Sequence, residues 1–300
     1  MNYDIKEIKK KKVRINNMST LKNKIDFAVV FSVRYANPNG DPLNGNRPRT
    51  TLDGYGEVSD VCIKRKIRNR MQDMGYDIFV QSEDRATDGY DSLKERADNN
   101  EQIAAAKKAK NRGLYAEAAC KSWLDVRSFG QVFAFKDKNS TAGISISVRG
   151  PVSVQSAYSI EPAEVSEMQI IKSVNGESGD RKGRDTMAIK HRVDFGIYVF
   201  KGSINCQLAE KTGFSEEDAE VIKEALCTLF ENDCSAARPD GSMEVLKMFW
   251  WKHNCANGQY SSAKIQRTLK IDIKKSRSSD INDYEIYTED YPNLKPEIYE

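Results

Sequence analysis

The segment from Ile25 to Tyr35, IDFAVVFSVRY, constrains the fold most, because apolar residues alternate along it with a period of two. Its odd-numbered positions share one face of an extended chain, which predicts a β-strand. The next segment, ANPNGDPLNGNRPRTTLDGYGE, is dense in Asn, Pro, Gly and Asp and predicts a long loop. A loop of this length in a compact domain is usually functional or disordered.

A helix is predicted after this loop. Ser59 is placed to cap a helix that runs to about Met74 and is closed by Gly75. At 100° per residue the apolar side chains form one stripe, which consists of Ile63, Ile67, Met71 and Met74. The helix is therefore expected to dock against a sheet by this stripe.

The same helix is strongly basic. Residues 61–71, VCIKRKIRNRM, carry five positive side chains and no negative one, and Lys64, Arg65 and Arg68 fall away from the apolar stripe. A solvated helix face ordinarily places Glu or Asp four residues from such cations, and none occurs between Val61 and Gln72. The pattern favours a face that binds an anionic partner.

The remaining elements predict an α+β fold. We expect a partly helical insertion at 76–122, strands at 131–135, 144–155, 193–204 and 245–253, an extended segment at 168–174, an exposed loop or hairpin tip at 175–192, and a helix capped by Ser215 over 216–231. The order of strands and helices contains two split βαβ halves. Such an order indicates a ferredoxin-like or RNA-recognition-type core with insertions.

Most enzyme and metal motifs are missing from the sequence. It has no phosphate-binding GK[ST] loop, no GxGxxG after a strand, no HExxH and no GxSxG. His191 and His253 are its two histidines, so histidine acid–base chemistry is poorly supplied. A zinc site could be drawn from Cys227, Cys234, His253 and Cys255, but the spacing fits no finger or ribbon. We expect no metal and no cofactor.

Charge is unevenly distributed although the net charge is only +3. Residues 1–24 carry eight basic and two acidic side chains, and residues 280–300 carry one basic and seven acidic. The first 22 residues predict a mobile basic arm, and Met18 offers a shorter natural start. No apolar run is long enough to span a membrane and no secretory signal follows the lysines, so we expect a cytoplasmic protein without a membrane partner.

Binding residues are better supplied than catalytic ones. The loop after the first strand offers Arg47 and Arg49, the helix offers its cations, and a polar stretch near the end of the predicted hairpin offers Arg181, Lys182, Arg184, Lys190, His191 and Arg192. The Asn-Pro-Asn-Gly turn with Asn37 and Asn39 either shapes the loop or cradles phosphate oxygens with its backbone N–H groups. Basic loops beside a sheet form a track for a flexible single strand.

Several segments together resemble a known family. RYANPNGDPLNGNRPR, SDVCIKRKIRNRM, DVRSFGQVFAF with RGPVSVQ, and TMAIKHRVDFGIYVF occur in an order that resembles the backbone subunit of type I-C Cascade, a member of the Cas7 family and the RAMP superfamily. The resemblance covers about Lys24 to Ile273. It leaves out the basic arm and the acidic C-terminal segment.

The resemblance implies an RNA-recognition-like palm with inserted fingers and a projecting thumb. The palm would comprise 23–75 and 123–275, the fingers 76–122, the thumb 168–192, and the acidic tail 276–300. By similarity, the palm residues that hold the guide RNA would be Asn37, Arg47, Arg49, Lys64, Arg65, Arg68, Arg127, Phe129 and Gln155. The thumb residues would be Arg181, Arg184, Met187, Lys190 and His191, with Met187 wedging against a displaced nucleotide.

The resemblance also implies the partners. Several copies would line up along one CRISPR RNA, beside other Cascade subunits, and present the guide to a target DNA strand without cutting RNA themselves. Contacts to phosphate and sugar suit this role, because they leave base edges free to pair. The alternative is a ribonuclease of the wider family that uses a loop aspartate, for which Asp41 is the candidate. A general single-strand binder is disfavoured by the small number of aromatic residues on the candidate surface.

Overall fold

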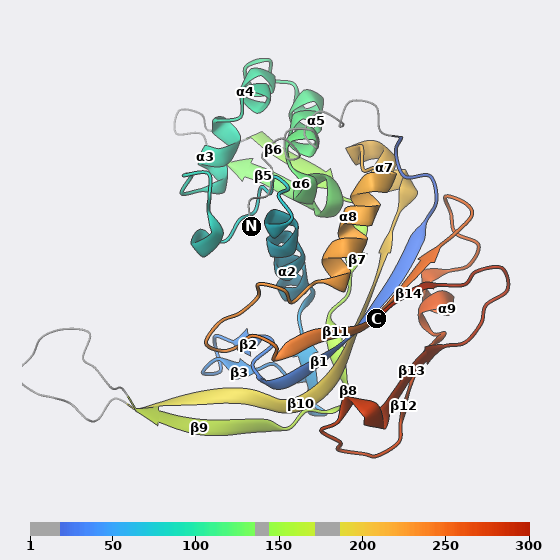
Figure 1. Ribbon diagram of the computed structural model, residues 1–300. Helices are drawn as coiled ribbons and strands as arrows, with labels where there is room; N and C mark the ends of the chain where they lie inside the picture. Colours follow the sequence, from blue (N-terminus) through green and yellow to red (C-terminus); the bar gives the residue numbers. More distant parts are fainter. Residues whose placement is uncertain (1–18, 136–143, 172–186) are drawn as a thin grey trace, which may run out of the picture.

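A large antiparallel sheet forms the centre of the computed structural model, which describes residues 19–135, 144–171 and 187–300 (Figure 1). Its strands are β1 (Ile25–Ala36), β4 (Tyr55–Val58), β7 (Val152–Val154), β8 (Ala157–Pro162), β9 (Val165–Ile171), β10 (Met187–Ile204), β11 (Met243–Lys252) and β14 (Glu297–Tyr299). The spatial order is β14-β11-β1-β10-β8-β4, and β7 and β9 also pair with β10. The expected mixed fold of helices and strands is confirmed in this form.

Strand β1 lies in the middle of the sheet, where the sequence predicts a strand. Its neighbours are β10, which pairs Ile204 with Ile25, and β11, which pairs Lys252 with Ile25. All residues from Ile25 to Val33 are buried. Both faces of the strand are therefore covered, including the face formed by the even-numbered residues.

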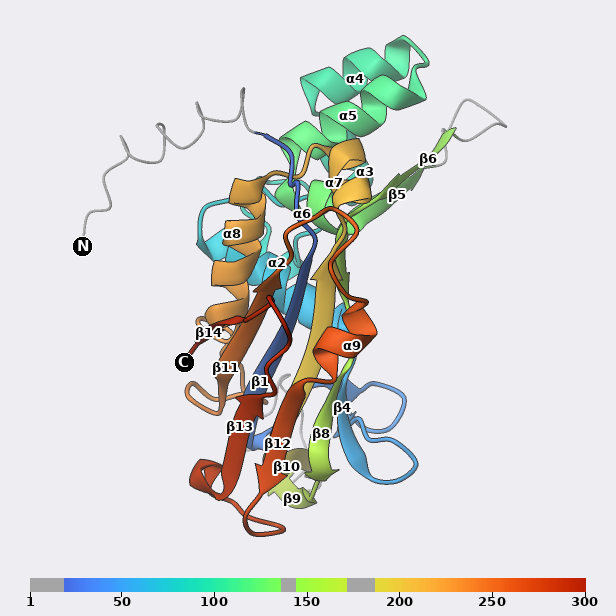
Figure 2. The same ribbon diagram turned by 90° about the vertical axis from the view of Figure 1, so that its right-hand side faces the viewer.

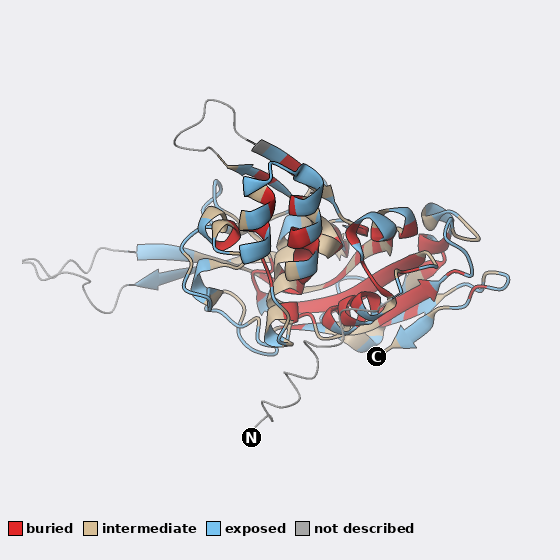
Figure 3. Cartoon of the chain, turned by 90° about the horizontal axis from the view of Figure 1, so that it is seen from above, coloured by how far each residue is buried: buried red, intermediate tan, exposed pale blue. Residues whose placement is uncertain are grey.

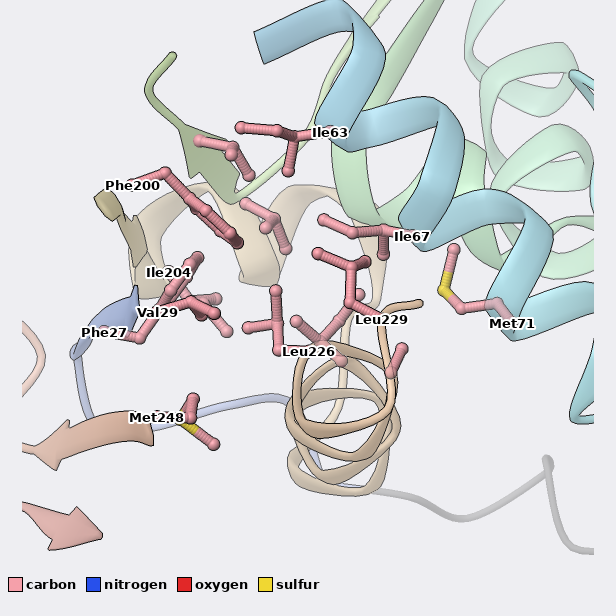
Figure 4. Packing of buried hydrophobic residues seen from close by; sticks show 14 of the residues in the cluster. Phe27, Val29, Ile63, Ile67, Met71, Phe200, Ile204, Leu226, Leu229 and Met248 are labelled. Atoms are coloured by element: carbon pink, nitrogen blue, oxygen red, sulfur yellow. The ribbon is translucent and has the colours of Figure 1, made fainter. Parts of the chain in front are cut away.

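Two helices cover one face of the sheet, α2 (Asp60–Asp73) and α8 (Glu216–Cys227). The Ser59 side chain accepts a hydrogen bond from the Cys62 N–H at 3.3 Å, which confirms the predicted N-cap. Figure 4 shows the predicted apolar stripe of α2 packed toward α8 and the sheet, and its labelled members are Ile63, Ile67 and Met71. Burial of this stripe, more than helix propensity, stabilises α2.

Helix α8 begins where predicted and ends earlier. Ser215 and Asp218 form a reciprocal capping box at its start. The helix was expected to reach about residue 231, but it stops at Cys227. At the next residue the Thr228 hydroxyl donates to the Glu224 carbonyl oxygen, and the backbone leaves the helical region at φ −113° and ψ 29°.

The C-terminal part covers the opposite face of the sheet (Figure 2). It contains α9 (Ser262–Gln266) and a two-stranded sheet of β12 (Leu269–Ile273) and β13 (Tyr284–Thr288). The acidic segment 276–300, expected to lie outside the palm, is thus integrated: Tyr284, Ile286 and Leu294 are buried, and β14 extends the main sheet along β11. The buried apolar residues of this segment lie between acidic ones along the chain, so the acidic composition did not indicate that the segment packs on the sheet.

The insertion has a small core of its own. Its elements are α3 (Leu93–Asp98), α4 (Glu101–Lys108), α5 (Arg112–Ser122), α6 (Leu124–Phe129), β5 (Gly130–Phe135) and β6 (Ile144–Arg149). The ring of Phe79 lies 4.5 Å from Trp123 and 5.1 Å from Phe133, between centroids. Helix α6 and the β5–β6 hairpin, expected to belong to the palm, therefore contribute to the core of the insertion.

The remaining elements are short. They are β2 (Gly40–Asp41), β3 (Arg47–Pro48), α7 (Cys206–Thr212) and two 3₁₀ turns at Glu83–Arg85 and Ile281–Asp283. Across the described ranges, no helix combines the length and the apolar character needed to cross a membrane.

Candidate nucleic-acid interface

The loop between β1 and α2 is ordered by its own polar side chains. The Asn39 side-chain oxygen accepts hydrogen bonds from the N–H and the hydroxyl of Ser59, both at 2.9 Å, so the loop is tied to the start of α2. Asn37 is 3% exposed, and its amide donates to the Asn46 carbonyl oxygen at 2.6 Å. The buried Asn37 side chain therefore stabilises the conformation of the loop.

Asp41 is a turn residue in this loop. Its carbonyl oxygen accepts from the N–H groups of Asn44 and Asn46, and its carboxylate accepts from the Leu43 N–H at 3.3 Å. The same carboxylate lies 3.3 Å from the Arg49 guanidinium. These contacts give the carboxylate a structural role in the turn.

Three cations lie near the surface at this point, and we call Arg47, Arg49 and Lys64 the loop–helix surface. Arg47 pairs with Glu167 of β9, Arg49 with Asp41, and Lys64 with Asp60 at 2.9 Å. Their side chains are 36%, 39% and 28% exposed, respectively. Exposed pairs of this kind contribute little to stability, so a phosphate can replace the carboxylate at low cost.

The other cations of α2 have partners within the chain that are buried or come from other segments, so the missing i,i+4 acids do not mark these cations as unpaired. Arg65 donates to the Val80 carbonyl oxygen at 2.6 Å, and burial, followed by the charge of Arg68, lowers its pKa. Lys66 pairs with Asp233, and Arg70 pairs with Glu231 at 2.6 Å. These partners come from other segments, where helical spacing does not detect them.

Arg68 is anchored to a fully buried carboxylate. Its Nε donates to the Asp125 carboxylate at 3.0 Å, and its guanidinium lies 4.9 Å from the centroid of the Phe129 ring. Asp125 is fully buried and also accepts from the N–H groups of Phe79 and Val80. Asp125 therefore joins α2 to the insertion, and Arg68 belongs to this junction.

Arg127 is likewise committed within the protein. Its guanidinium forms two hydrogen bonds to the Asp218 carboxylate, at 2.8 and 2.9 Å, and a third to the Cys120 carbonyl oxygen at 3.1 Å. Gln155 lies at the edge of the sheet, where its amide donates to the Gln266 side chain at 3.3 Å. The structure thus places Arg127 and Gln155 in separate networks.

Strands β9 and β10 project from the body as a long hairpin, and this hairpin contains the described residues of the predicted thumb (Figures 1 and 3). Lys190 donates to the Ala236 carbonyl oxygen at 2.7 Å, and the His191 Nδ1 atom lies 3.6 Å from the Glu167 carboxylate. Arg181 and Arg184 lie outside the described residues. Large apolar side chains are exposed on the hairpin: Met168, Ile170, Ile171, Met187 and Ile189.

Tyr35 is a candidate that the sequence reasoning missed. It has a positive φ of 50° and is 52% exposed, and the Arg192 guanidinium lies 4.7 Å from its ring centroid. The strand alternation placed Tyr35 on the apolar face with Phe31. The positive φ was the feature that alternation did not reveal, and an exposed ring of this kind suits base stacking.

The cysteine and histidine residues of the considered zinc site do not come together. His253 Nε2 lies 2.9 Å from the buried Asp26 carboxylate, and His253 Nδ1 accepts from the Gln259 N–H at 3.0 Å. Both ring nitrogens are thereby used in the fold. Among the residues that the structure describes, no group of three or more His, Cys, Asp or Glu is placed to hold a metal ion.

Comparison with known proteins gives one consistent family. Residues 23–289 match the family model described as CRISPR-associated protein Cas7. The CRISPR-associated protein Cas7 of Haloferax volcanii is 30% identical over 276 residues, which cover 87% of this chain and 78% of that protein.

Solved structures with a similar chain include a "CRISPR RNA-guided surveillance complex, pre-nicking" and a "CRISPR RNA-guided surveillance complex". They are 14% and 15% identical, each with a TM-score of 0.43, and cover 76% of this chain and 78% and 68% of theirs. On the family match and the sequence identity to the Haloferax protein, the chain belongs to the CRISPR-associated Cas7 protein family.

Proposed function

We propose that this protein is a non-catalytic backbone subunit that binds CRISPR RNA in a type I-C Cascade interference complex in the cytoplasm. Copies of the chain line up along one guide, beside other Cascade subunits, and present the guide for pairing with a target DNA strand. The observation that carries the proposal is the family match over residues 23–289. The sequence segments that resemble the type I-C subunit support the subtype.

The topology supports a ferredoxin-like palm. In chain order the elements β1, α2, β8, β10, α8 and β11 follow the βαββαβ pattern, and the four strands lie in the order β11-β1-β10-β8. The insertion with its own aromatic core corresponds to the fingers, and the β9–β10 hairpin to the thumb. The fingers are therefore assigned to a part of the fold with its own core, and the thumb to the projecting end of a palm strand.

Guide binding is assigned to phosphate contacts, and the residues divide into two roles. The loop–helix surface carries cations whose carboxylate partners are partly or largely exposed, and phosphates replace these carboxylates. Arg65, Arg68 and Phe129 lie at the junction of α2 with the insertion, Arg127 joins the insertion to α8, and Asn37 holds the loop. Sequence-independent contacts of this kind suit a guide whose spacer varies.

The first test follows complex mass and RNA integrity together. Purified protein is mixed with end-labelled RNA of CRISPR length, with and without Mg²⁺. Intact RNA in complexes whose mass increases in steps with RNA length is the expected result. RNA that binds a single copy whatever its length would contradict the role as a backbone subunit.

The ribonuclease alternative is tested by Asp41→Asn, which keeps an acceptor for the Leu43 N–H. RNA length is expected to stay constant over the incubation with either protein, because the Asp41 carboxylate serves the turn and the Arg49 pair. Denaturing electrophoresis of the labelled RNA checks this. Discrete products with the wild type that disappear with the variant would make the protein an enzyme.

The hairpin is expected to contact a neighbouring copy and its RNA. Ile171 and Met187 pair across the hairpin and are 68% and 65% exposed. Changing both to Asp introduces charges into a surface that assembly buries, so complexes of two or more copies are expected to need at least tenfold more protein, because burying an unpaired charge costs more than ~1.4 kcal/mol.

Mass photometry on long and short RNA measures this effect. Binding of one copy to a short RNA should persist, since the loop–helix surface is intact. Val132→Asp, at a residue 56% exposed on the β5–β6 hairpin, is the matched control. Normal stepwise assembly of the Ile171/Met187 variant would exclude the hairpin from the contact.

A further inference from the structure

Lys201 is a residue of β10 and lies opposite the gap between β7 and β8, the two strands that pair with β10 at this edge of the sheet. Strand β7 pairs with β10 at residues 202–204, and β8 pairs with it at Tyr198 and Val199. Between these two strands, the Gln155 N–H donates to the Lys201 carbonyl oxygen at 2.9 Å. Ile197 and Val199 point toward the C-terminal part, so Lys201, two residues further on, points to that same face, opposite α2.

Two further cations converge on this position. Gln266, at the end of α9, is 7% exposed and donates to the Gly202 carbonyl oxygen at 3.2 Å, which places Arg267 beside Lys201. Lys270 follows on β12. Burial, and then the charges of Arg267 and Lys270, lower the pKa of Lys201. Arg267 and Lys270 therefore act on Lys201 as like charges.

Two members of this cluster, Lys201 and Arg267, lack within the described residues the carboxylate partner that several other partly buried cations have. Lys66, Arg68 and Arg127 each face an aspartate. Over the described ranges, Lys201 and Arg267 have no hydrogen-bond acceptor or ion-pair partner for their side chains, and Lys270 has the Glu289 carboxylate at 3.6 Å. Holding like charges together costs free energy, which a bound anion offsets.

The cluster is continuous with the proposed guide-binding side. The Gln155 amide donates to Gln266, and the adjacent Ser156 hydroxyl accepts from the Asp60 N–H at the start of α2, at 3.2 Å. The two-residue link between β7 and β8 thus contacts both the cation cluster and α2. A nucleic-acid strand bound at α2 can reach the cation cluster around this edge of the sheet. This connection favours a nucleic-acid strand over a separate acidic protein as the occupant of the cluster.

We propose that Lys201, Arg267 and Lys270 form a second phosphate site, which holds a phosphodiester group of a nucleic-acid strand on the sheet face opposite α2. A planar guanidinium with two ammonium groups matches the charge and the acceptor oxygens of a phosphodiester. The inference rests on the proposed function, since it assumes that a nucleic acid is bound. The phosphate belongs either to the guide or to the paired target strand.

The test compares Lys201→Gln/Arg267→Gln with Lys275→Gln/Lys295→Gln, which removes two exposed lysines elsewhere in the C-terminal part. Affinity is measured against salt concentration for single-stranded RNA and for an RNA–DNA heteroduplex. For a guide phosphate, loss of this one contact should lower the log–log slope on RNA by about 0.7 and the affinity near 0.1 M salt by roughly 5-fold. A loss confined to the heteroduplex would assign the phosphate to the target strand.

Two outcomes separate the hypotheses. If the wild type binds no RNA, the proposed function fails. If the wild type binds and the Lys201/Arg267 variant keeps its slope on both ligands, the second phosphate site is overturned.

Without nucleic acid, the variant should melt at the same or a higher temperature, because repulsion between the cations is relieved. A clear decrease in melting temperature would show that these cations stabilise the fold and would also overturn the site.

Discussion

Asp125→Ala is expected to lower the free energy of unfolding by about 3 to 5 kcal/mol, the cost of removing one partner of a buried ion pair. The carboxylate is fully buried and accepts from Arg68 Nε at 3.0 Å, from the Phe79 N–H at 2.7 Å and from the Val80 N–H at 3.1 Å. The variant leaves all three donors without this acceptor. The loss should be largest between α2 and the insertion.

Chemical denaturation measures this loss, and hydrogen exchange at Phe79 and Val80 locates it. The control is Glu117→Ala on α5, which removes a carboxylate that is 57% exposed and paired with Lys121. That change should cost at most about 1 kcal/mol. A loss below 1 kcal/mol for Asp125→Ala would mean that water or a rearranged side chain replaces the carboxylate, and that Arg68 is free to serve the RNA.

Replacement of Arg47, Arg49 and Lys64 by Ala is expected to weaken RNA binding roughly 100-fold near 0.1 M salt and to reduce the log–log salt slope by about 2. Each phosphate contact to a single strand contributes about 0.7 to that slope. The carboxylate partners of these three cations are partly or largely exposed, so the fold should tolerate removal of the cations. A variant that included Arg65 and Arg68 would mix lost binding with lost packing.

Fluorescence anisotropy with labelled RNA at several salt concentrations checks this expectation. Lys121, Lys211 and Lys295 changed together to Ala remove the same charge from exposed positions away from the loop. This control should keep most of the slope. If the loop–helix variant is folded and retains the wild-type slope, the phosphates of the guide are held elsewhere on the protein.

Local patterns were sufficient to predict the elements whose signals lie within the element. Strand β1 has a period of two, and α2 has a cap at Ser59, an apolar stripe and a closing Gly75. Helix α8 begins at the predicted N-cap, Ser215. The C-terminal strands could not be predicted this way, because short pieces such as Glu297–Tyr299 become strands only by pairing with β11.

The candidate site was predictable by residue type but not by role. Positive charge on α2 is visible in the sequence, whereas the aspartates that bind Arg68, Arg127 and Lys66 lie 57, 91 and 167 residues away. Tertiary pairing therefore separates anchored cations from available ones. The cluster around Lys201 was missed for the same reason, since its members are distant in sequence and meet only in the fold.

Strand β10 is one uninterrupted strand of 18 residues that begins in the projecting hairpin and ends between β1 and β7. The hairpin is thus a continuation of the central sheet and has no hinge loop at its base on this strand. Its angle to the body follows from the twist of the sheet. In a filament built by hairpin contacts, the helical pitch is therefore a property of the buried core: substitutions far from any interface, which alter sheet twist, would change the number of nucleotides spanned by each turn.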